Sequence, residues 1–218
     1  MTPSGGLYQP PHFARNAPEQ RADAIAVMRA HPFATLLSVV DGAPMVSHAP
    51  LELQQDGDAL TLLGHFAAPN PHAKALADGA PVTAIFHGPD GYVSPSWYEA
   101  REAVPTWNYI VVHARGRVRR IDDPDGKERV LKALIDRHDR AYRAQWDALP
   151  LEFREKMKRG IVAFEIAVDR WRVKFKLSQN RSAFDKASVL AHMERAEAPR
   201  AADRRELGAW MRRLGIGT

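Results

Sequence analysis

The 218-residue chain contains no cysteine. This absence excludes a disulfide scaffold, a thiolate zinc site, an Fe–S cluster and a cysteine nucleophile. Long hydrophobic runs are also missing, since no apolar segment approaches the roughly 20 residues that a membrane span requires. The first residues, Met1–Gly6, lack the basic and apolar regions of a signal peptide. We therefore expect a soluble, cytoplasmic protein that does not enter a membrane.

Positive charge is scarce over most of the chain and concentrated at one end. Residues 1–169 hold 19 Lys/Arg and 21 Asp/Glu, whereas residues 170–218 hold 12 and 5. Such asymmetry indicates a phosphate or polyanion partner. It is equally compatible with an Arg-rich helical surface that faces solvent, so the charge count alone leaves both interpretations open.

The hydrophobic pattern predicts an antiparallel β protein. The composition, with 45% hydrophobic and 26% charged residues, is that of a globular chain. Runs of β-branched and aromatic residues, separated by turn signals such as Asp41-Gly42, predict strands at residues 33–40, 45–53, 59–66, 81–87, 106–120 and 161–177. Helices are predicted at residues 17–30, 71–77, 122–142, 151–158, 182–194 and 202–214. The order favours a β-barrel with peripheral helices, and no GxGxxG or Walker loop indicates another nucleotide-binding fold.

The strand that follows residue 169 carries a basic row. Because side chains alternate faces along a strand, one face of this strand bears four cations, namely Arg170, Arg172, Lys174 and Lys176. Like charges so close repel one another unless an anion or carboxylates sit nearby, which favours a phosphate or nucleic-acid face. An exposed edge strand protected by charge is the alternative. The next residues, Ser178-Gln179-Asn180-Arg181, suit either a phosphate or ring edge, or a turn with a helix cap.

Two further segments combine polar and aromatic side chains. In Gly64–His72 a strand leads into a helix whose free N–H groups favour an anion, although Asn70 could simply cap that helix. Residues 88–105 form a long irregular loop, which is usually functional in a compact domain. The aromatic residues of 86–109, which include Trp107 beside Asn108, could stack a planar ligand or could only hold the loop in place.

Taken together, these segments resemble the PaiB-like negative transcriptional regulators, FMN-binding proteins of the split-barrel flavoprotein type. The resemblance runs from Leu7 to about Glu194. It is carried by blocks that occur in order: Leu7–Phe13, His31–Leu36, His48–Leu51, Gly64-His65 with Asn70-Pro71, Phe86–Pro89, Tyr92–Tyr98, Val104–Tyr109 and Lys174–Arg181.

The resemblance implies a homodimer of six-stranded antiparallel split barrels with FMN at the dimer interface. The barrel would occupy residues 1–181 with inserted helices, and residues 182–218 would form a helical extension packed on the barrel or on the partner. Mapped onto this chain, the implied cofactor-binding residues are His65, Asn70, Trp107, Asn108, Lys174, Lys176, Ser178, Gln179, Asn180 and Arg181.

The chain departs from the family pattern at one position. The pattern reads Gly-His-x-Ala-Arg-x-Asn-Pro, and Ala68 occupies the place of the arginine. If that arginine holds the flavin phosphate, losing its charge-assisted hydrogen bond costs about 1.5–3 kcal/mol, which is roughly ten- to a hundredfold in affinity. We therefore expect weakened FMN binding in this chain.

The resemblance leaves several functions open. The first is an FMN-binding negative regulator, the second a flavin-dependent oxidoreductase acting on a small molecule, and the third a haem- or metal-binding split barrel that uses some of the nine histidines. Residues 182–194 and 202–214 are joined by about seven residues, too many for the short turn of a helix-turn-helix. Arg212 and Arg213 could still contact DNA phosphates, so direct DNA binding stays open, while no residue is assigned a catalytic role.

Overall fold

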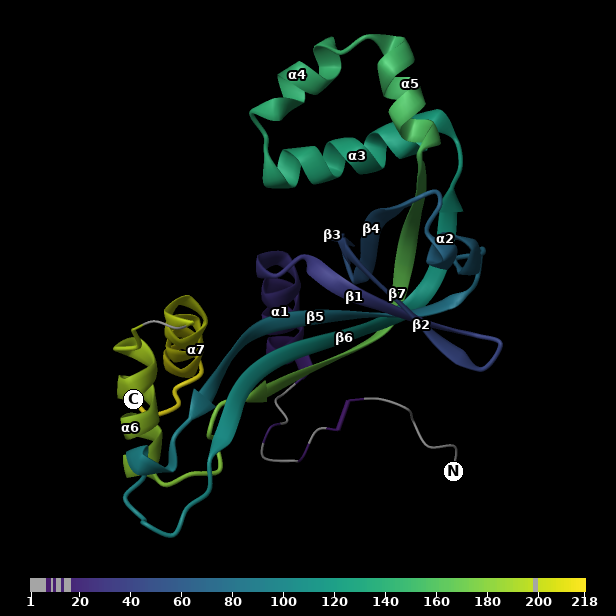
Figure 1. Cartoon of the computed structure of the whole chain (residues 1–218). Helices are drawn as coiled ribbons and strands as arrows, with labels where there is room; N and C mark the ends of the chain where they lie inside the picture. Colours follow the sequence, from purple (N-terminus) through teal and green to yellow (C-terminus); the bar gives the residue numbers. More distant parts are fainter. Residues whose placement is uncertain (1–6, 9, 11–12, 14–16, 198–199) are drawn as a thin grey trace. The chain divides into compact units, whose positions relative to one another are not determined.

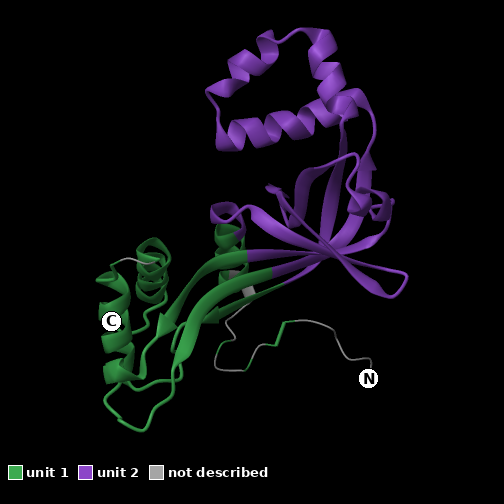
Figure 2. Ribbon diagram, viewed as in Figure 1, with its two compact units in different colours: residues 1–27, 87–112, 172–218 green, residues 28–86, 113–171 purple. Residues whose placement is uncertain are grey.

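The computed structural model describes residues 7–8, 10, 13, 17–197 and 200–218 (Figure 1). The segment Met1–Gly6 and part of the Leu7–Phe13 block lie outside the described residues. The chain divides into two compact units (Figure 2). Unit 1 comprises residues 1–27, 87–112 and 172–218, and unit 2 comprises residues 28–86 and 113–171. Within the described residues, no helix is long and apolar enough to cross a membrane.

The protein is mainly antiparallel β, as predicted, but its sheet has seven strands rather than six. They are β1 (Phe33–Val40), β2 (Ala43–Pro50), β3 (Glu52–Asp56), β4 (Ala59–Ala67), β5 (Pro81–Val93), β6 (Thr106–Ile121) and β7 (Ile161–Lys176). The strand order is β2-β1-β5-β6-β7-β4-β3, so β2 and β3 lie at opposite ends of an open sheet. The expected split barrel of six strands is therefore corrected in its strand count: the sheet has seven strands and is not closed.

The extra strand arises at Pro50. The predicted strand 45–53 splits there, because proline cannot donate to a ladder and Leu51 N–H donates to Pro32 O at 2.9 Å. Before the break, β2 pairs with β1, and after it β3 pairs with β4. The hairpin predicted at Asp41-Gly42 is confirmed, since both residues adopt the positive φ of a tight turn, 50° and 78°.

Unit 2 places a group of helices beside β4 and the neighbouring part of β7. These are α3 (Pro124–His138), α4 (Tyr142–Ala148) and α5 (Leu151–Arg159), which leave the sheet after β6 and return to it at β7 (Figure 1). The short helix α2 (Pro71–Ala75) follows β4. Part of the core of unit 2 combines α3 with the sheet and is formed by Leu63, Ile121, Val130, Leu134 and Ala163.

The helix predicted for residues 122–142 is confirmed as α3 over Pro124–His138, but it ends earlier than predicted. The chain leaves helical geometry at Asp139, where φ is −151° and ψ is 73°. The side chain of Asp139 accepts a hydrogen bond from Tyr142 N–H at 3.2 Å, which starts α4. An aspartate can compete in this way with the helix backbone because its carboxylate lies close to nearby amides.

Unit 1 packs helices against the other ends of β5, β6 and β7. It contains α1 (Ala17–Ala30) up to Val27, the 3₁₀ turn η2 (Pro95–Trp97), α6 (Ala183–Glu194) and α7 (Ala201–Arg213). Phe175 on β7 contacts Trp210 on α7 with ring centroids 5.2 Å apart. The cap predicted for α6 is confirmed, since Ser182 Oγ accepts from Asp185 N–H at 3.1 Å.

Strand β5 extends to Val93, so the prediction that it ends at residue 87 was wrong. Gly88 explains much of this extension. A side chain there would lie 3.1 Å from both Cβ and the carbonyl oxygen of Ile110, so glycine allows β5 and β6 to stay in close contact. The irregular segment is consequently shorter than the predicted loop of residues 88–105, and the aromatic residues of 86–109 begin on β5.

Candidate functional site

A buried lysine marks the centre of the candidate site in unit 1. Lys174 is 6% exposed, and its ammonium lies 5.3 Å from the ring centroids of Tyr8 and Tyr109 and 5.9 Å from that of Phe13. Aromatic faces attract cations, which compensates part of the cost of burial. Among the residues that the structure describes, Lys174 has no carboxylate partner, so its charge is balanced by rings alone.

Two further cations lie close to Lys174. Lys176 Nζ donates to Thr106 Oγ1 and, at 2.7 Å, to Trp107 O. The guanidinium of Arg181 lies over Tyr98, with its central carbon 4.2 Å from the ring centroid. Burial lowers the pKa of Lys176, and the positive charges of Lys174 and Arg181 lower it further. We name Lys174, Lys176 and Arg181 the cation cluster; an anion among them would relieve their mutual repulsion.

Asn108 adds an unused hydrogen-bond donor beside the cluster. Its side chain is fully buried, and its Oδ1 accepts from Ser178 Oγ at 3.1 Å. Its Nδ2 has no hydrogen-bond partner. A buried polar atom left without a partner is costly, so a ligand acceptor at this position would be stabilising. Ser178 itself adopts a φ of 64°, a backbone conformation that non-glycine residues adopt only occasionally.

The turn that follows the cluster has a structural task as well. Gln179 Oε1 accepts from Leu177 N–H at 2.7 Å, and Gln179 Nε2 donates to Phe175 O at 2.5 Å. The side chain therefore closes the turn at the end of β7. Asn180 is exposed. The turn geometry, which was one of the two sequence interpretations, accounts for both positions without a ligand.

The outer face of β6 in unit 1 presents aromatic side chains. Trp107 is 47% exposed, while Asn108 on the opposite face is buried, which confirms the alternation expected for this strand. The Tyr92 ring meets Trp107 edge-on, with centroids 6.1 Å apart and an interplanar angle of 77°. A hollow of about 340 Å³ adjoins them and is lined by His87, Gly88, Asp90, Trp107, Tyr109, Ile110 and Val111.

The remaining predicted site residues lie in unit 2. Asn70 caps α2: its Oδ1 accepts from His72 N–H at 2.9 Å, and its Nδ2 donates to Ser47 Oγ at 3.2 Å. His65 is largely buried, its Nδ1 has no hydrogen-bond partner, and burial lowers its pKa. At the departure from the family pattern, Ala68 N–H donates to Gly160 O at 2.8 Å. Unit 1 thus brings together the other eight predicted residues, and His65 and Asn70 belong to unit 2.

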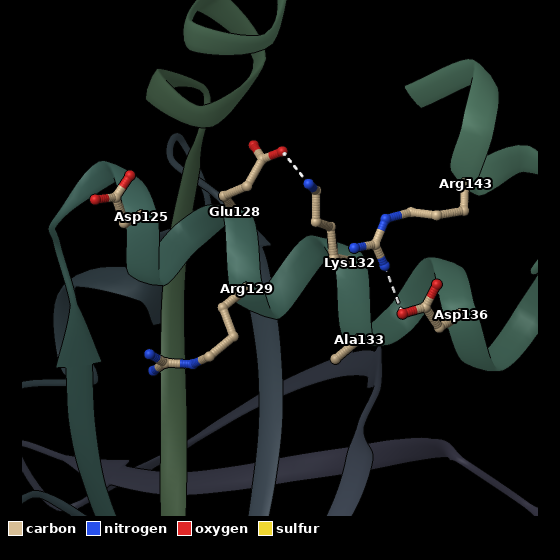
Figure 3. Close-up of a pocket in the computed structure, with 7 residues that line it drawn as sticks. All are labelled: Asp125, Glu128, Arg129, Lys132, Ala133, Asp136 and Arg143. Carbon is tan, nitrogen blue, oxygen red and sulfur yellow. Dashed lines mark hydrogen bonds and ion pairs between the residues drawn. The ribbon is translucent and has the colours of Figure 1, made fainter. Parts of the chain in front are cut away.

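In a second hollow, in unit 2, acidic and basic side chains form ion pairs with one another. This hollow measures about 480 Å³ and lies along α3. Figure 3 shows two of its charged pairs: Lys132 reaches Glu128 at 3.4 Å, and Arg143 reaches Asp136 at 2.5 Å. Because these acidic and basic side chains neutralise each other, the hollow gives no electrostatic reason to expect a charged ligand.

Three of the four arginines of the last helix, α7, have partners within the chain, whereas Arg204 has none among the described residues. Arg212 forms a two-point ion pair with Glu194, one contact measuring 2.7 Å, and Arg213 reaches Asp23 at 2.7 Å. Arg205 donates to Ala196 O at 3.0 Å. These contacts support the interpretation of α7 as a surface helix. Among the described residues, no three His, Asp or Glu side chains gather as a metal site would require.

Comparison with known proteins identifies a matching family. The sequence profile described as "Putative FMN-binding domain" matches residues 7–170. The chain is 34% identical over 177 residues to the protease synthase and sporulation protein PAI 2 of Bacillus subtilis, covering 80% of this chain and 84% of that protein. It is 30% identical over 186 residues to an uncharacterized protein of Emericella nidulans, covering 68% and 74%.

Two solved structures share the fold. One is the FAD and heme binding protein from Mycobacterium smegmatis, with a TM-score of 0.54, 25% identity and coverage of 75% of this chain and 72% of that chain. The other is the flavocytochrome Anf3 from Azotobacter vinelandii, with a TM-score of 0.57, 22% identity and coverage of 75% and 69%. From the matched profile and the PAI 2 relative, the chain belongs to the PaiB-like family of proteins with an FMN-binding-type domain.

Proposed function

We propose that this protein binds FMN through the cation cluster of unit 1 and acts as a negative regulator of gene expression. The observation that carries the flavin proposal is the cluster itself: three cations lie together, and within the described residues none of them pairs with a carboxylate. Membership of the family supports FMN. The M. smegmatis protein is named for FAD and heme, so it supports a flavin in general. The regulatory role rests on the resemblance to the PaiB-like regulators, to which the relative named protease synthase and sporulation protein PAI 2 corresponds.

The residues of unit 1 fit the chemistry of FMN. FMN joins a planar, electron-poor ring to a phosphate, and when bound it supplies redox chemistry that side chains lack. Lys176 and Arg181 would hold the phosphate through charge-assisted hydrogen bonds. Trp107 offers an exposed ring face for stacking. Asn108 is a separate predicted contact on the buried face of β6, where its unpaired Nδ2 offers a donor to a ligand acceptor.

The other predicted contacts are part of the proposal. Ser178, Gln179 and Asn180 would border the ligand at the turn after β7. His65 and Asn70 stay predicted cofactor-binding residues, and near them in the sequence Ala68 replaces the arginine of the family pattern, which would weaken binding. We further propose a cytoplasmic homodimer of split barrels, in which residues 1–181 form the barrel and residues 182–218 a helical extension. Contact with DNA, direct or through a partner, belongs to the same regulatory proposal.

A flavin-dependent oxidoreductase is the second candidate function. It is favoured by the hollow of about 340 Å³ that shares Trp107 and Tyr109 with the proposed flavin site. A small molecule there would lie against the same aromatic face. Consumption of NADH or NADPH by the FMN-loaded protein would favour this candidate over a regulator.

Titration of FMN into the purified protein tests the flavin proposal. We expect saturable quenching of flavin fluorescence together with a perturbed visible flavin spectrum. Lys176→Gln should weaken binding about tenfold, because it removes a charge-assisted hydrogen bond. Lys156→Gln is the matched control: it makes the same change at an exposed position on α5 in unit 2 and should leave the affinity within about twofold.

The result that overturns the flavin proposal is a wild-type protein that takes up no FMN. Equal weakening by Lys176→Gln and Lys156→Gln would instead remove the cation cluster from the proposed site. Comparing the thermal unfolding of each variant with that of the wild type confirms that affinity is measured on folded protein.

A further inference from the structure

A third hollow, in unit 2, carries an excess of positive charge that the flavin proposal does not use. It measures about 380 Å³ and is lined by Pro81, Arg115, Gly116, Arg117, Asp169 and Arg170. Arg115 has an interaction of its own, so the imbalance concerns Arg117 and Arg170, two guanidinium groups beside one carboxylate. Such an imbalance attracts an anion from solution and is relieved when one binds.

The backbone brings these arginines together. Arg115 and Arg117 are two residues apart on β6, so their side chains project from the same face of the strand. Between them, a side chain at Gly116 would place its Cβ 2.2 Å from Ala167 O on β7, a distance that no side chain tolerates. Glycine thus permits β6 and β7 to approach closely, which sets Asp169 and Arg170 beside the two β6 arginines.

Two of the arginines are available for a ligand in different ways. Arg117 Nη1 donates to Gly79 O at 2.9 Å, which fixes the guanidinium and leaves most of its five N–H donors unused. Arg170 is exposed and, within the described part of the chain, has no hydrogen-bond or ion-pair partner. One fixed and one uncommitted guanidinium suit a tetrahedral oxyanion, because each can donate two parallel hydrogen bonds to it.

The neighbouring arginine on the same strand shows the contrast. Arg119 projects from the same face of β6 as Arg115 and Arg117, yet its Nε pairs with Glu165 at 2.6 Å. Its charge is neutralised by that partner. We name the third hollow the arginine hollow; of its arginines, Arg117 and Arg170 form no ion pair with a carboxylate among the described residues.

We infer that the arginine hollow binds a phosphate group. It lies in a different unit from the cation cluster, and it contains no aromatic ring for stacking. The phosphate would come either from a free phosphate or from the backbone of a nucleic acid. A regulator that contacts DNA would use this strand face rather than Arg205, Arg212 and Arg213 of α7, which already have internal partners.

Binding measurements with two probes distinguish these sources. Inorganic phosphate is titrated by calorimetry, and a labelled random-sequence DNA duplex is titrated by fluorescence anisotropy at two salt concentrations. Arg117→Gln/Arg170→Gln should weaken binding of at least one probe about tenfold or more. The matched control is Arg119→Gln/Arg129→Gln, which removes the same charge from the same unit and should change either affinity less than about twofold.

Each outcome has a definite meaning. Loss of inorganic phosphate binding in the hollow variant supports a free phosphate as the source. Loss of duplex binding alone, with a reduced salt dependence, supports a nucleic-acid backbone. Absence of binding by the wild type, or equal weakening by the hollow and control variants, overturns the inference. The FMN affinity of the hollow variant should be unchanged within about twofold. The inference and the flavin proposal are therefore tested independently of each other.

Discussion

Two regions of unit 1 are both rich in basic residues, but the charges of these residues are balanced to different degrees. The cation cluster of Lys174, Lys176 and Arg181 has no carboxylate partner among the described residues. On α7, by contrast, Arg212 pairs with Glu194 and Arg213 pairs with Asp23. The same side-chain chemistry therefore stabilises the fold in one region and remains available for a ligand in the other. Basic residues indicate a binding site only where their charge is not already balanced.

The largest expected difference between the two regions is in FMN affinity. Lys176→Gln/Arg181→Gln should weaken FMN binding about a hundredfold, because two charge-assisted hydrogen bonds are lost at an uncompensated site. Arg205→Gln/Arg212→Gln removes the same net charge from α7 and should change the affinity less than about twofold. Flavin fluorescence titration measures both. Equal losses would show that overall charge, rather than the cluster, attracts the flavin.

The reverse difference is expected in stability. Arg213→Ala should lower the free energy of unfolding by about 1–2 kcal/mol, since it weakens the compensation of a buried carboxylate. Asp23 is only 5% exposed in this pair, and Arg213 also lies 4.7 Å from the Trp210 ring centroid. Arg212→Ala breaks a more exposed pair and should cost less than about 1 kcal/mol. Urea unfolding of the two variants checks the order, which an equal cost would contradict.

The burial of two histidines in unit 2 predicts that the stability of the fold depends on pH. Burial lowers the pKa of both His65 and His72, so these histidines bind protons more weakly in the folded state than in the unfolded state. The free energy of unfolding should therefore fall as the pH drops below about 6.5, by at most about 1.4 kcal/mol per pH unit for each histidine. In His65→Gln/His72→Gln this slope should be flatter, as urea unfolding at several pH values can measure. An unchanged slope would assign the acid sensitivity to other groups.

A smaller effect should distinguish lysine from arginine within the cluster. The pKa of Lys176 is lowered by burial and by its cationic neighbours, so its charge is lost at a lower pH than that of an ordinary lysine. FMN affinity should accordingly fall a few-fold as the pH rises through that pKa. Lys176→Arg keeps its charge at alkaline pH and should abolish the decline. A pH series of FMN titrations measures this, and identical profiles for the two proteins would exclude Lys176 as the titrating group.

Local features were predictable where a few adjacent residues determine them. The turn at Asp41-Gly42, the caps at Asn70 and Ser182 and the alternation along β6 all follow from neighbouring side chains. The predictions that were wrong concern features that depend on contacts between distant parts of the chain. Strand β5 extends beyond residue 87 because Gly88 packs on Ile110, and β3 exists because it pairs with β4 on the far side of Pro50.

The sequence by itself determined the antiparallel β character, the family and the positions of the basic residues. Only the tertiary structure decided which of these residues retain an unbalanced charge. The reason is distance along the chain: Arg213 is neutralised by Asp23 and Arg119 by Glu165, partners that no local pattern reveals. Coulomb energy depends on separation in space, so the fold, not the composition, determines where an anion is attracted.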